Sequence, residues 1–271
     1  MIGVHISKTN GEFHEQIPEL ARKWGFGAFQ IFVIGPQNLK ISHIDIPATA
    51  SAIRAEKAHV YIHSSYLVRP WGVEAYNLPM SIKQLKISAK LGALGVVFHL
   101  PNMPLADVVP GVMRILTVKP AGARVIWENA ALKNYPENSF SRPEQLNALV
   151  DGLLAAGAKL PDIHFCIDTS HLYCSGVDLR TASAARGWFA ALKYPATIRL
   201  FHLNGNASTS HIDVHAVPMS TRDVLFTEPR RTSGLTVIRK FAKKSRCDII
   251  LECNLEAEKV AVRRLLKSGM V

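Results

Sequence analysis

Residues 80–99 read MSIKQLKISAKLGALGVVFH and contain the unit from which the fold can be predicted. Between Met80 and Leu91 the apolar residues recur at three- and four-residue spacing, which is typical of an amphipathic helix. Gly92 then gives the signal of a helix C-terminus. The apolar run Val96–His99 follows, and it has the length and composition of a buried parallel strand. The unit is therefore a helix followed by a strand that ends on a histidine.

Apolar runs of the same kind recur along the whole chain and predict a series of buried strands. The eight runs are Ile2–Ile6, Phe29–Val33, Val60–His63, Val96–His99, Val125–Glu128, Phe165–Asp168, Ile198–His202 and Ile249–Glu252. Helical patterns lie between them, as in Gln16–Lys23 and Pro143–Leu154, and Gly25 and Gly157 give further helix-end signals. The spacing of the runs, about 34 residues, suits a strand, a crossover helix and two loops.

This rhythm predicts an α/β fold, a (β/α)8 TIM barrel. A doubly wound open sheet is the alternative, but no glycine-rich phosphate fingerprint follows the first strand. No linker or low-complexity tract divides the chain, and the longest poorly patterned stretch is Asn204–Gly234. We therefore expect residues 1–271 to form a single (β/α)8 barrel catalytic domain.

The composition excludes several classes of protein. A hydrophobic content of 48% with 20% charged residues is too apolar for intrinsic disorder. The chain has 32 Lys and Arg against 21 Asp and Glu, a net charge of +11, which favours a polyanionic partner such as nucleic acid. No signal-peptide pattern precedes the first strand, no stretch could span a membrane, and four cysteines are too few for a disulfide framework. We expect an intracellular protein with no membrane partner.

Histidines and carboxylates end six successive predicted strands: His63, His99, Glu128, Asp168, His202 and Glu252. The C-terminal ends of barrel strands face one mouth, where active sites are built. Asp168-Thr169-Ser170-His171 adds an imidazole, and Asp213-Val214-His215 adds another Asp/His pair. Such groups cost several kcal/mol to bury unless metal ions neutralise them. Imidazoles mixed with carboxylates favour zinc, and also suit manganese or iron, whereas magnesium prefers fewer imidazoles.

These segments resemble the endonuclease IV family of zinc-dependent apurinic/apyrimidinic (AP) endonucleases. The matching segments, in order, are 63–67, Phe98-His99, Trp127-Glu128-Asn129, 166–171, His202-Leu203-Asn204, Asp213-Val214-His215 and Leu251-Glu252. The resemblance runs from Gly3 to Asn254. The segments 31–36 and Arg69-Pro70-Trp71 resemble the versions carried by large DNA viruses.

The resemblance implies three Zn2+ ions at the C-terminal ends of the strands, with Mn2+ or Fe as an alternative at one of the sites. The first ion would be held by His63, His99 and Glu128, the second by Glu128, Asp168, His202 and Glu252, and the third by His171, Asp213 and His215. Glu128 and Glu252 are the expected catalytic residues. The implied reaction is hydrolysis of the phosphodiester 5′ to an abasic site in duplex DNA, leaving a 3′-hydroxyl. We expect the nucleophile to be a hydroxide that bridges the first two ions.

The resemblance also points to DNA-binding positions at His5, Gln37, Tyr66 and Leu67, and Arg69 lies in a loop that we place at the barrel mouth, where it can meet a phosphate. Tyr66 and Leu67 match family positions that push into the base stack where the lesion is flipped out. Three departures alter the expected DNA path and keep every metal ligand. Gln37 stands where the family often has an arginine, Val214 where it has a basic residue, and residues 216–219 (AVPM) replace a glycine-rich segment.

Other functions fit parts of the same pattern. A metal-dependent sugar isomerase or epimerase on the same barrel would explain the fold, but neither the third ligand cluster nor the charge of +11. A second alternative is a lesion-binding protein that does not cut, although the presence of all nine ligands argues against it. A third is a DNA enzyme of different specificity, such as a damage endonuclease acting on ultraviolet photoproducts. We expect duplex DNA with abasic sites as the partner of a monomeric enzyme in the cytoplasm or nucleus, or in the virion if the origin is viral.

Overall fold

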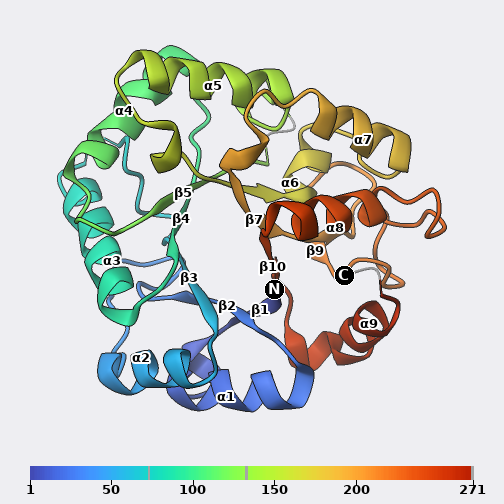
Figure 1. The fold of residues 1–271 in the computed structure, drawn as a ribbon, viewed down its shortest axis with the longest axis horizontal. Coiled ribbons are helices and arrows are strands. Elements are labelled where there is room, and N and C mark those ends of the chain that lie inside the picture. Colours follow the sequence, from blue (N-terminus) through green and yellow to red (C-terminus); the bar gives the residue numbers. More distant parts are fainter. Residues whose placement is uncertain (73, 132–133, 270–271) are drawn as a thin grey trace.

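The computed structural model describes residues 1–72, 74–131 and 134–269. Within these ranges eight parallel strands close into a barrel that is surrounded by helices (Figure 1). Around the barrel the strands follow the order β1-β10-β7-β6-β5-β4-β3-β2. Their bounds are Ile2–Ile6 (β1), Ala28–Phe32 (β2), His59–His63 (β3), Gly95–His99 (β4), Val125–Glu128 (β5), Phe165–Asp168 (β6), Ile198–His202 (β7) and Asp248–Leu251 (β10). The predicted TIM barrel is confirmed.

Helices follow the strands and form the outer ring seen in Figure 1. They are α1 (Phe13–Trp24), α2 (Ile46–Ala55), α3 (Asn77–Leu91), α4 (Leu105–Val118), α5 (Pro143–Ala155), α6 (Thr169–Cys174), α7 (Ala182–Ala190), α8 (Gly234–Ser245) and α9 (Leu255–Lys267). Gly92 ends α3 as predicted: its φ of 70° is left-handed, and its amide donates to the carbonyl oxygens of Ala89 and Ser88. The end of α5 differs from the prediction, because Ala156 is the C-cap and Gly157, with φ 94°, follows it.

The strands β2, β3, β4 and β10 begin one residue earlier than predicted. Two of them, β2 and β10, also end one residue earlier, and the hydrogen bonds explain why. The eighth strand was expected to include Glu252, but β10 ends at Leu251 because the Glu252 amide donates to Asn204 Oδ1 (3.1 Å) instead of to a neighbouring strand. Val33 was expected in the second strand, but β2 ends one residue earlier. The Val33 carbonyl oxygen accepts instead from the Ser42 amide (2.9 Å), within the loop that follows. The Glu252 side chain still lies at the barrel mouth, and Val33 is buried in the main core.

Alternation along the strands gives the barrel interior an apolar middle layer, with residues on the opposite parity packing against the helices. The middle layer consists of Ala28, Tyr61, Val97, Ile126, Cys166, Leu200 and Ile250. The residues two positions further along each strand also point inward, and they lie at the C-terminal mouth of the barrel. The side chains at His63, His99, Glu128, Asp168 and His202 are therefore directed to a common place.

The poorly patterned stretch Asn204–Gly234 contains a small antiparallel ladder between β8 (Gly205–Asn206) and β9 (His215–Ala216). Asn206 pairs with His215, so the connecting loop returns Asp213 and His215 to the barrel mouth. In the described part of the chain, no helix combines the length and apolar character needed to cross a membrane.

Candidate metal centre

Glu128 lies at the middle of the cluster and is fully buried. Its Oε2 is 3.2 Å from His63 Nε2 and 3.1 Å from His99 Nε2. Its Oε1 is 2.7 Å from His202 Nδ1 and 3.6 Å from His171 Nδ1. One carboxylate thus faces imidazoles from four other segments, with a different pair on each oxygen.

Asp168 and Glu252 lie near the same nitrogen of His202 that contacts Glu128. The Nδ1 atom of His202 is 3.4 Å from Glu252 Oε2 and 3.9 Å from Asp168 Oδ2. Asn204 bridges the two carboxylates, because its amide Nδ2 donates to Asp168 Oδ2 (2.6 Å) and to Glu252 Oε2 (3.1 Å). The Asp168 Oδ1 atom caps α6 by accepting from the His171 amide (2.9 Å), which fixes the Asp168–His171 segment in place.

Asp213 and His215 form the outer part of the cluster. Asp213 Oδ2 is 3.3 Å from His171 Nε2, and Asp213 Oδ1 is 3.1 Å from His215 Nε2. Ser170 donates to Asp213 Oδ1 (3.1 Å) and so holds this carboxylate from the α6 side. Asp213 is about one-third exposed, unlike the fully buried Glu128 and Asp168, so this part of the cluster faces solvent.

In His63, His171 and His202 one ring nitrogen bonds to a backbone carbonyl or an amide oxygen, which leaves the other nitrogen for the cluster. His63 Nδ1 donates to the Ser64 carbonyl oxygen (2.8 Å), and His171 Nδ1 donates to that of Asn129 (2.8 Å). His202 Nε2 lies 2.7 Å from Gln30 Oε1. Metal-binding histidines are oriented in this way by partners on the nitrogen that does not bind the ion.

Several groups of ligand atoms in the cluster are close enough to share an ion. Their members lie within 4.8 Å of one another in the groups His63/His99/Glu128, Glu128/Asp168/His202/Glu252 and Asp168/His171/His215, among others. The first two groups coincide with two of the three ligand sets that the family resemblance implies. In the third, Asp168 is grouped with the two histidines, while Asp213 contacts each of those histidines separately.

The electrostatics of these residues fit metal binding. Burial alone would raise the pKa of Glu128, but His202 and His99 hold it well below its usual range. Burial would lower the pKa of His215, but Asp168 and Asp213 raise it to about 9. The His215 Nε2 atom is buried and lies 3.1 Å from Asp213 Oδ1 and 3.7 Å from Asp168 Oδ2. Ring nitrogens that hold protons against carboxylates are positions where a dication can replace those protons.

The candidate DNA-binding residues occupy the loops beside this cluster. Tyr66 is 47% exposed and Leu67 41%, and the Tyr66 ring lies 5.4 Å from that of His99. The Tyr66 amide donates to the Pro36 carbonyl oxygen (2.9 Å), so the exposed Gln37 lies in a loop joined to the Tyr66 loop. Gln37, Tyr66 and Leu67 therefore form one protruding edge.

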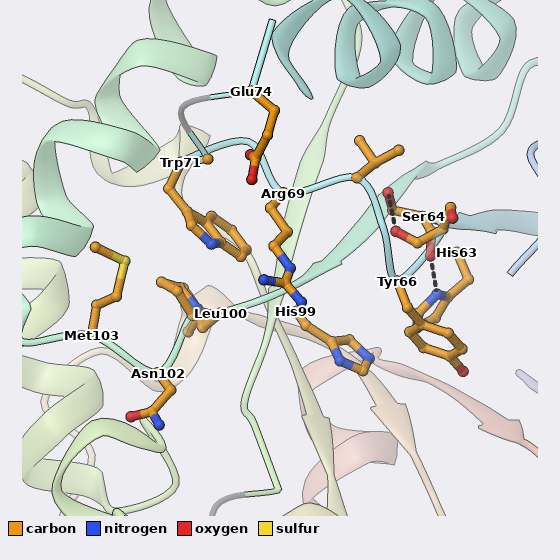
Figure 2. Close-up of a pocket in the computed structure, with 14 residues that line it drawn as sticks. His63, Ser64, Tyr66, Arg69, Trp71, Glu74, His99, Leu100, Asn102 and Met103 are labelled. Carbon is orange, nitrogen blue, oxygen red and sulfur yellow. Dashed lines mark hydrogen bonds between the residues drawn. The ribbon is translucent and has the colours of Figure 1, made fainter. Parts of the chain in front are cut away.

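A cavity of about 610 Å³ opens next to that edge. His63, Tyr66, Arg69, Trp71 and His99 contribute to its lining, and Figure 2 shows Arg69 extending from its loop toward His99. The arginine is exposed, so its guanidinium can meet an anionic ligand that reaches the metal cluster. The opening is thus polar at its metal end and aromatic along its wall.

His5 and Gln30 lie on the inner wall of the same mouth. His5, expected to contact DNA, has its Nδ1 3.3 Å from Gln30 Nε2 and its ring 4.8 Å from that of Phe32. Sequence reasoning did not select Gln30, which is fully buried and donates to Glu252 Oε1 (2.6 Å). The signal that could have identified it is the alternation of side chains along a strand. A polar residue two positions after the inward-facing Ala28 of β2 must also face the barrel interior.

The fold and the cluster define a class: TIM-barrel proteins with a polynuclear ligand set at the C-terminal mouth. No family model matches the chain. It is 28% identical over 241 residues to a probable AP endonuclease of African swine fever virus, covering 85% of this chain and 80% of that protein. The crystal structure titled AsfvAP:AG matches with a TM-score of 0.84 and 25% identity, covering 99% of this chain and 98% of the other.

Endonuclease IV from Thermus thermophilus matches with a TM-score of 0.76 and 24% identity, covering 99% of each chain, which supports the fold. The predicted resemblance to the endonuclease IV family is therefore confirmed, and its large-DNA-virus type fits. The chain is a nuclease, and its sequence and fold are similar to those of proteins named AP endonuclease or endonuclease IV.

Proposed function

We propose that this chain is a DNA-repair enzyme that hydrolyses the phosphodiester on the 5′ side of abasic sites in duplex DNA and leaves a 3′-hydroxyl. The observation that carries the proposal is the convergence of five histidines and four carboxylates at one barrel mouth, in overlapping groups of metal-ligand spacing. The similarity to a viral protein named as a probable AP endonuclease supports the choice of substrate.

The proposed ligands of three zinc ions are those that the family resemblance implies. Bound zinc would neutralise the phosphate and provide hydroxide as a nucleophile at neutral pH. Glu128 is the residue placed to serve two ions, because each of its oxygens faces a different pair of imidazoles. Glu252 is held by Gln30 and Asn204, so its carboxylate keeps one orientation in the mouth.

The loops beside the mouth would present the DNA to this centre. The exposed Tyr66 and Leu67 offer an apolar wedge for the gap that an abasic nucleotide leaves in the base stack. Arg69 offers a guanidinium to a backbone phosphate at the entrance of the cavity. The net charge of +11 suits a partner whose backbone is anionic.

The test is cleavage of a labelled duplex that contains one abasic-site analogue, before and after chelation and after zinc is restored. We expect a cut immediately 5′ to the lesion that is lost on chelation, restored by zinc, and extendable by a DNA polymerase from its 3′-hydroxyl. Tight binding without any cut would instead indicate a lesion-binding protein. If the protein neither binds nor cuts the duplex, the proposal is contradicted. That outcome would favour an enzyme acting on small sugars.

A further inference from the structure

The N-terminal end of the barrel, opposite the metal centre, holds a second cavity of about 360 Å³. Tyr61 and Ile126 of the apolar middle layer form part of its wall. Asp248 and His59 also line it, and they are the first residues of β10 and β3. Because the middle layer lies between the two ends of the barrel, this cavity is separate from the one beside Tyr66.

Three arginines, Arg124, Arg199 and Arg246, line the cavity and are exposed. Among the described residues, none of the three guanidinium groups forms an ion pair or a hydrogen bond. The nearby carboxylates have other partners. Asp248 accepts from the Met1 amino group (2.6 Å), His59 Nδ1 (2.6 Å) and Tyr61 Oη (2.7 Å).

The second acidic group near the cavity is also engaged. Asp162 lies 3.7 Å from the Lys119 ammonium group. The arginines therefore leave a local excess of positive charge around a concave site. Exposed guanidinium groups without partners are free to bind an anion in a bidentate manner.

His164 provides a second, independent observation at the same cavity. It is only 7% exposed, and its Nδ1 has no hydrogen-bond partner among the described residues. Burial and the neighbouring Arg199 and Arg124 lower the pKa of His164 to about 4, so the ring is neutral at pH 7. A buried ring nitrogen without a partner costs free energy unless a ligand or water completes it.

We propose that this cavity binds a phosphate group, as inorganic phosphate or as the monoester of a small metabolite. The three guanidiniums match the charge and the several acceptor oxygens of a phosphate dianion. The His164 imidazole supplies one further hydrogen bond from the cavity wall. The volume is at the lower end of the range for small-molecule sites, and Ile126 offers an apolar surface to the remainder of a monoester.

The test compares phosphate binding by three zinc-loaded proteins: the wild type, the double variant Arg124→Gln/Arg246→Gln, and the control Arg54→Gln/Arg186→Gln. The two control arginines are exposed on α2 and α7 and do not line the cavity. Titration calorimetry would use inorganic phosphate, adenosine 5′-monophosphate and an undamaged duplex. Phosphate that binds the zinc centre contributes equally in all three proteins, so the difference between them reports this cavity.

We expect the control to bind like the wild type and the double variant to bind at least tenfold more weakly, with abasic-site cleavage unchanged. If the monoester binds more tightly than inorganic phosphate, and both bind more weakly to the double variant, the ligand is a metabolite. If the two ligands bind equally tightly to the wild type and both bind more weakly to the double variant, the ligand is inorganic phosphate. Equal binding by all three proteins, or none by the wild type at millimolar concentration, overturns the proposal. Loss of duplex binding alone in the double variant also overturns it, because the arginines would then serve nucleic acid. The single variant Arg199→Gln repeats the test if the double variant fails to fold.

Discussion

Replacing Gln30 by alanine should weaken zinc binding although Gln30 is not itself a proposed ligand. Its side chain is fully buried and joins two ligands: it donates to Glu252 Oε1 (2.6 Å) and accepts from His202 Nε2 (2.7 Å). The second bond directs His202 Nδ1 toward Glu128 Oε1 (2.7 Å), into the cluster. Without Gln30, Glu252 loses a donor and the His202 ring loses the partner that sets its orientation.

The magnitude follows from these two bonds. Partners that orient metal ligands typically account for about 10- to 100-fold in metal affinity, or about 1.4–2.7 kcal/mol. We therefore expect Gln30→Ala to bind zinc about 10- to 100-fold more weakly in a chelator competition. Cleavage of the abasic duplex should fall by a similar factor at limiting zinc and recover in large part at saturating zinc, because all nine proposed ligands remain.

A matched control separates this effect from a general loss of stability. Gln16 is also buried, and its Nε2 donates to the carbonyl oxygens of Ser7 (2.9 Å) and Gly11 (2.8 Å). Gln16→Ala thus removes two hydrogen bonds between α1 and the loop that follows β1, and neither of them involves a proposed metal ligand. Both variants should unfold more easily, by about 1–3 kcal/mol. Unchanged zinc affinity in Gln30→Ala, or an equal loss in Gln16→Ala, would refute the reasoning.

Three further changes test other parts of the molecule. Glu128→Gln should reduce kcat/KM for abasic-duplex cleavage by at least about 100-fold and lower the bound zinc measured by elemental analysis; normal turnover would remove Glu128 from the site. Tyr66→Ala should weaken binding to an abasic duplex by about tenfold at unchanged zinc content, whereas Tyr135→Ala, a change at a similarly exposed tyrosine, should not. Burial and Arg199 lower the pKa of His164 to about 4. The contribution of the neutral ring to the free energy of unfolding is therefore fully present above pH 6.5 and is lost as the pH falls toward 4. Urea unfolding should show that the free energy of unfolding decreases less between pH 7 and pH 4.5 in His164→Gln than in the wild type, by up to about 3 kcal/mol. An equal decrease in the two proteins would contradict this.

The barrel was predictable because its strands carry local signals. Each apolar run is short, and helical periodicity separates it from the next, as in residues 80–99. The bounds were less predictable, since Glu252 leaves β10 through a hydrogen bond to Asn204, a residue 48 positions away. A bond of that kind depends on tertiary structure, and no local pattern announces it.

The candidate site was also predictable only in part. The histidines and carboxylates at the strand ends could be selected because strand polarity brings them to one mouth. The residues that orient them, such as Gln30, Asn129 and Asn204, are ordinary amides in the sequence. Their roles depend on which side chain stands opposite in the closed barrel, and pairing across the barrel is set by topology and register.

The choice of amides as these partners has an electrostatic reason. Asn204 donates to both Asp168 and Glu252, and Gln30 donates to Glu252, so the carboxylates are held by donors without net charge. In the described ranges no lysine or arginine forms an ion pair with these carboxylates or with Glu128. A cationic partner would occupy the same oxygens and repel a dication, whereas an amide fixes the carboxylate and leaves its charge for the metal. Substituting lysine for Gln30 should therefore cost more zinc affinity than substituting alanine, even though lysine restores a donor to Glu252, and chelator competition on the two variants would show the order.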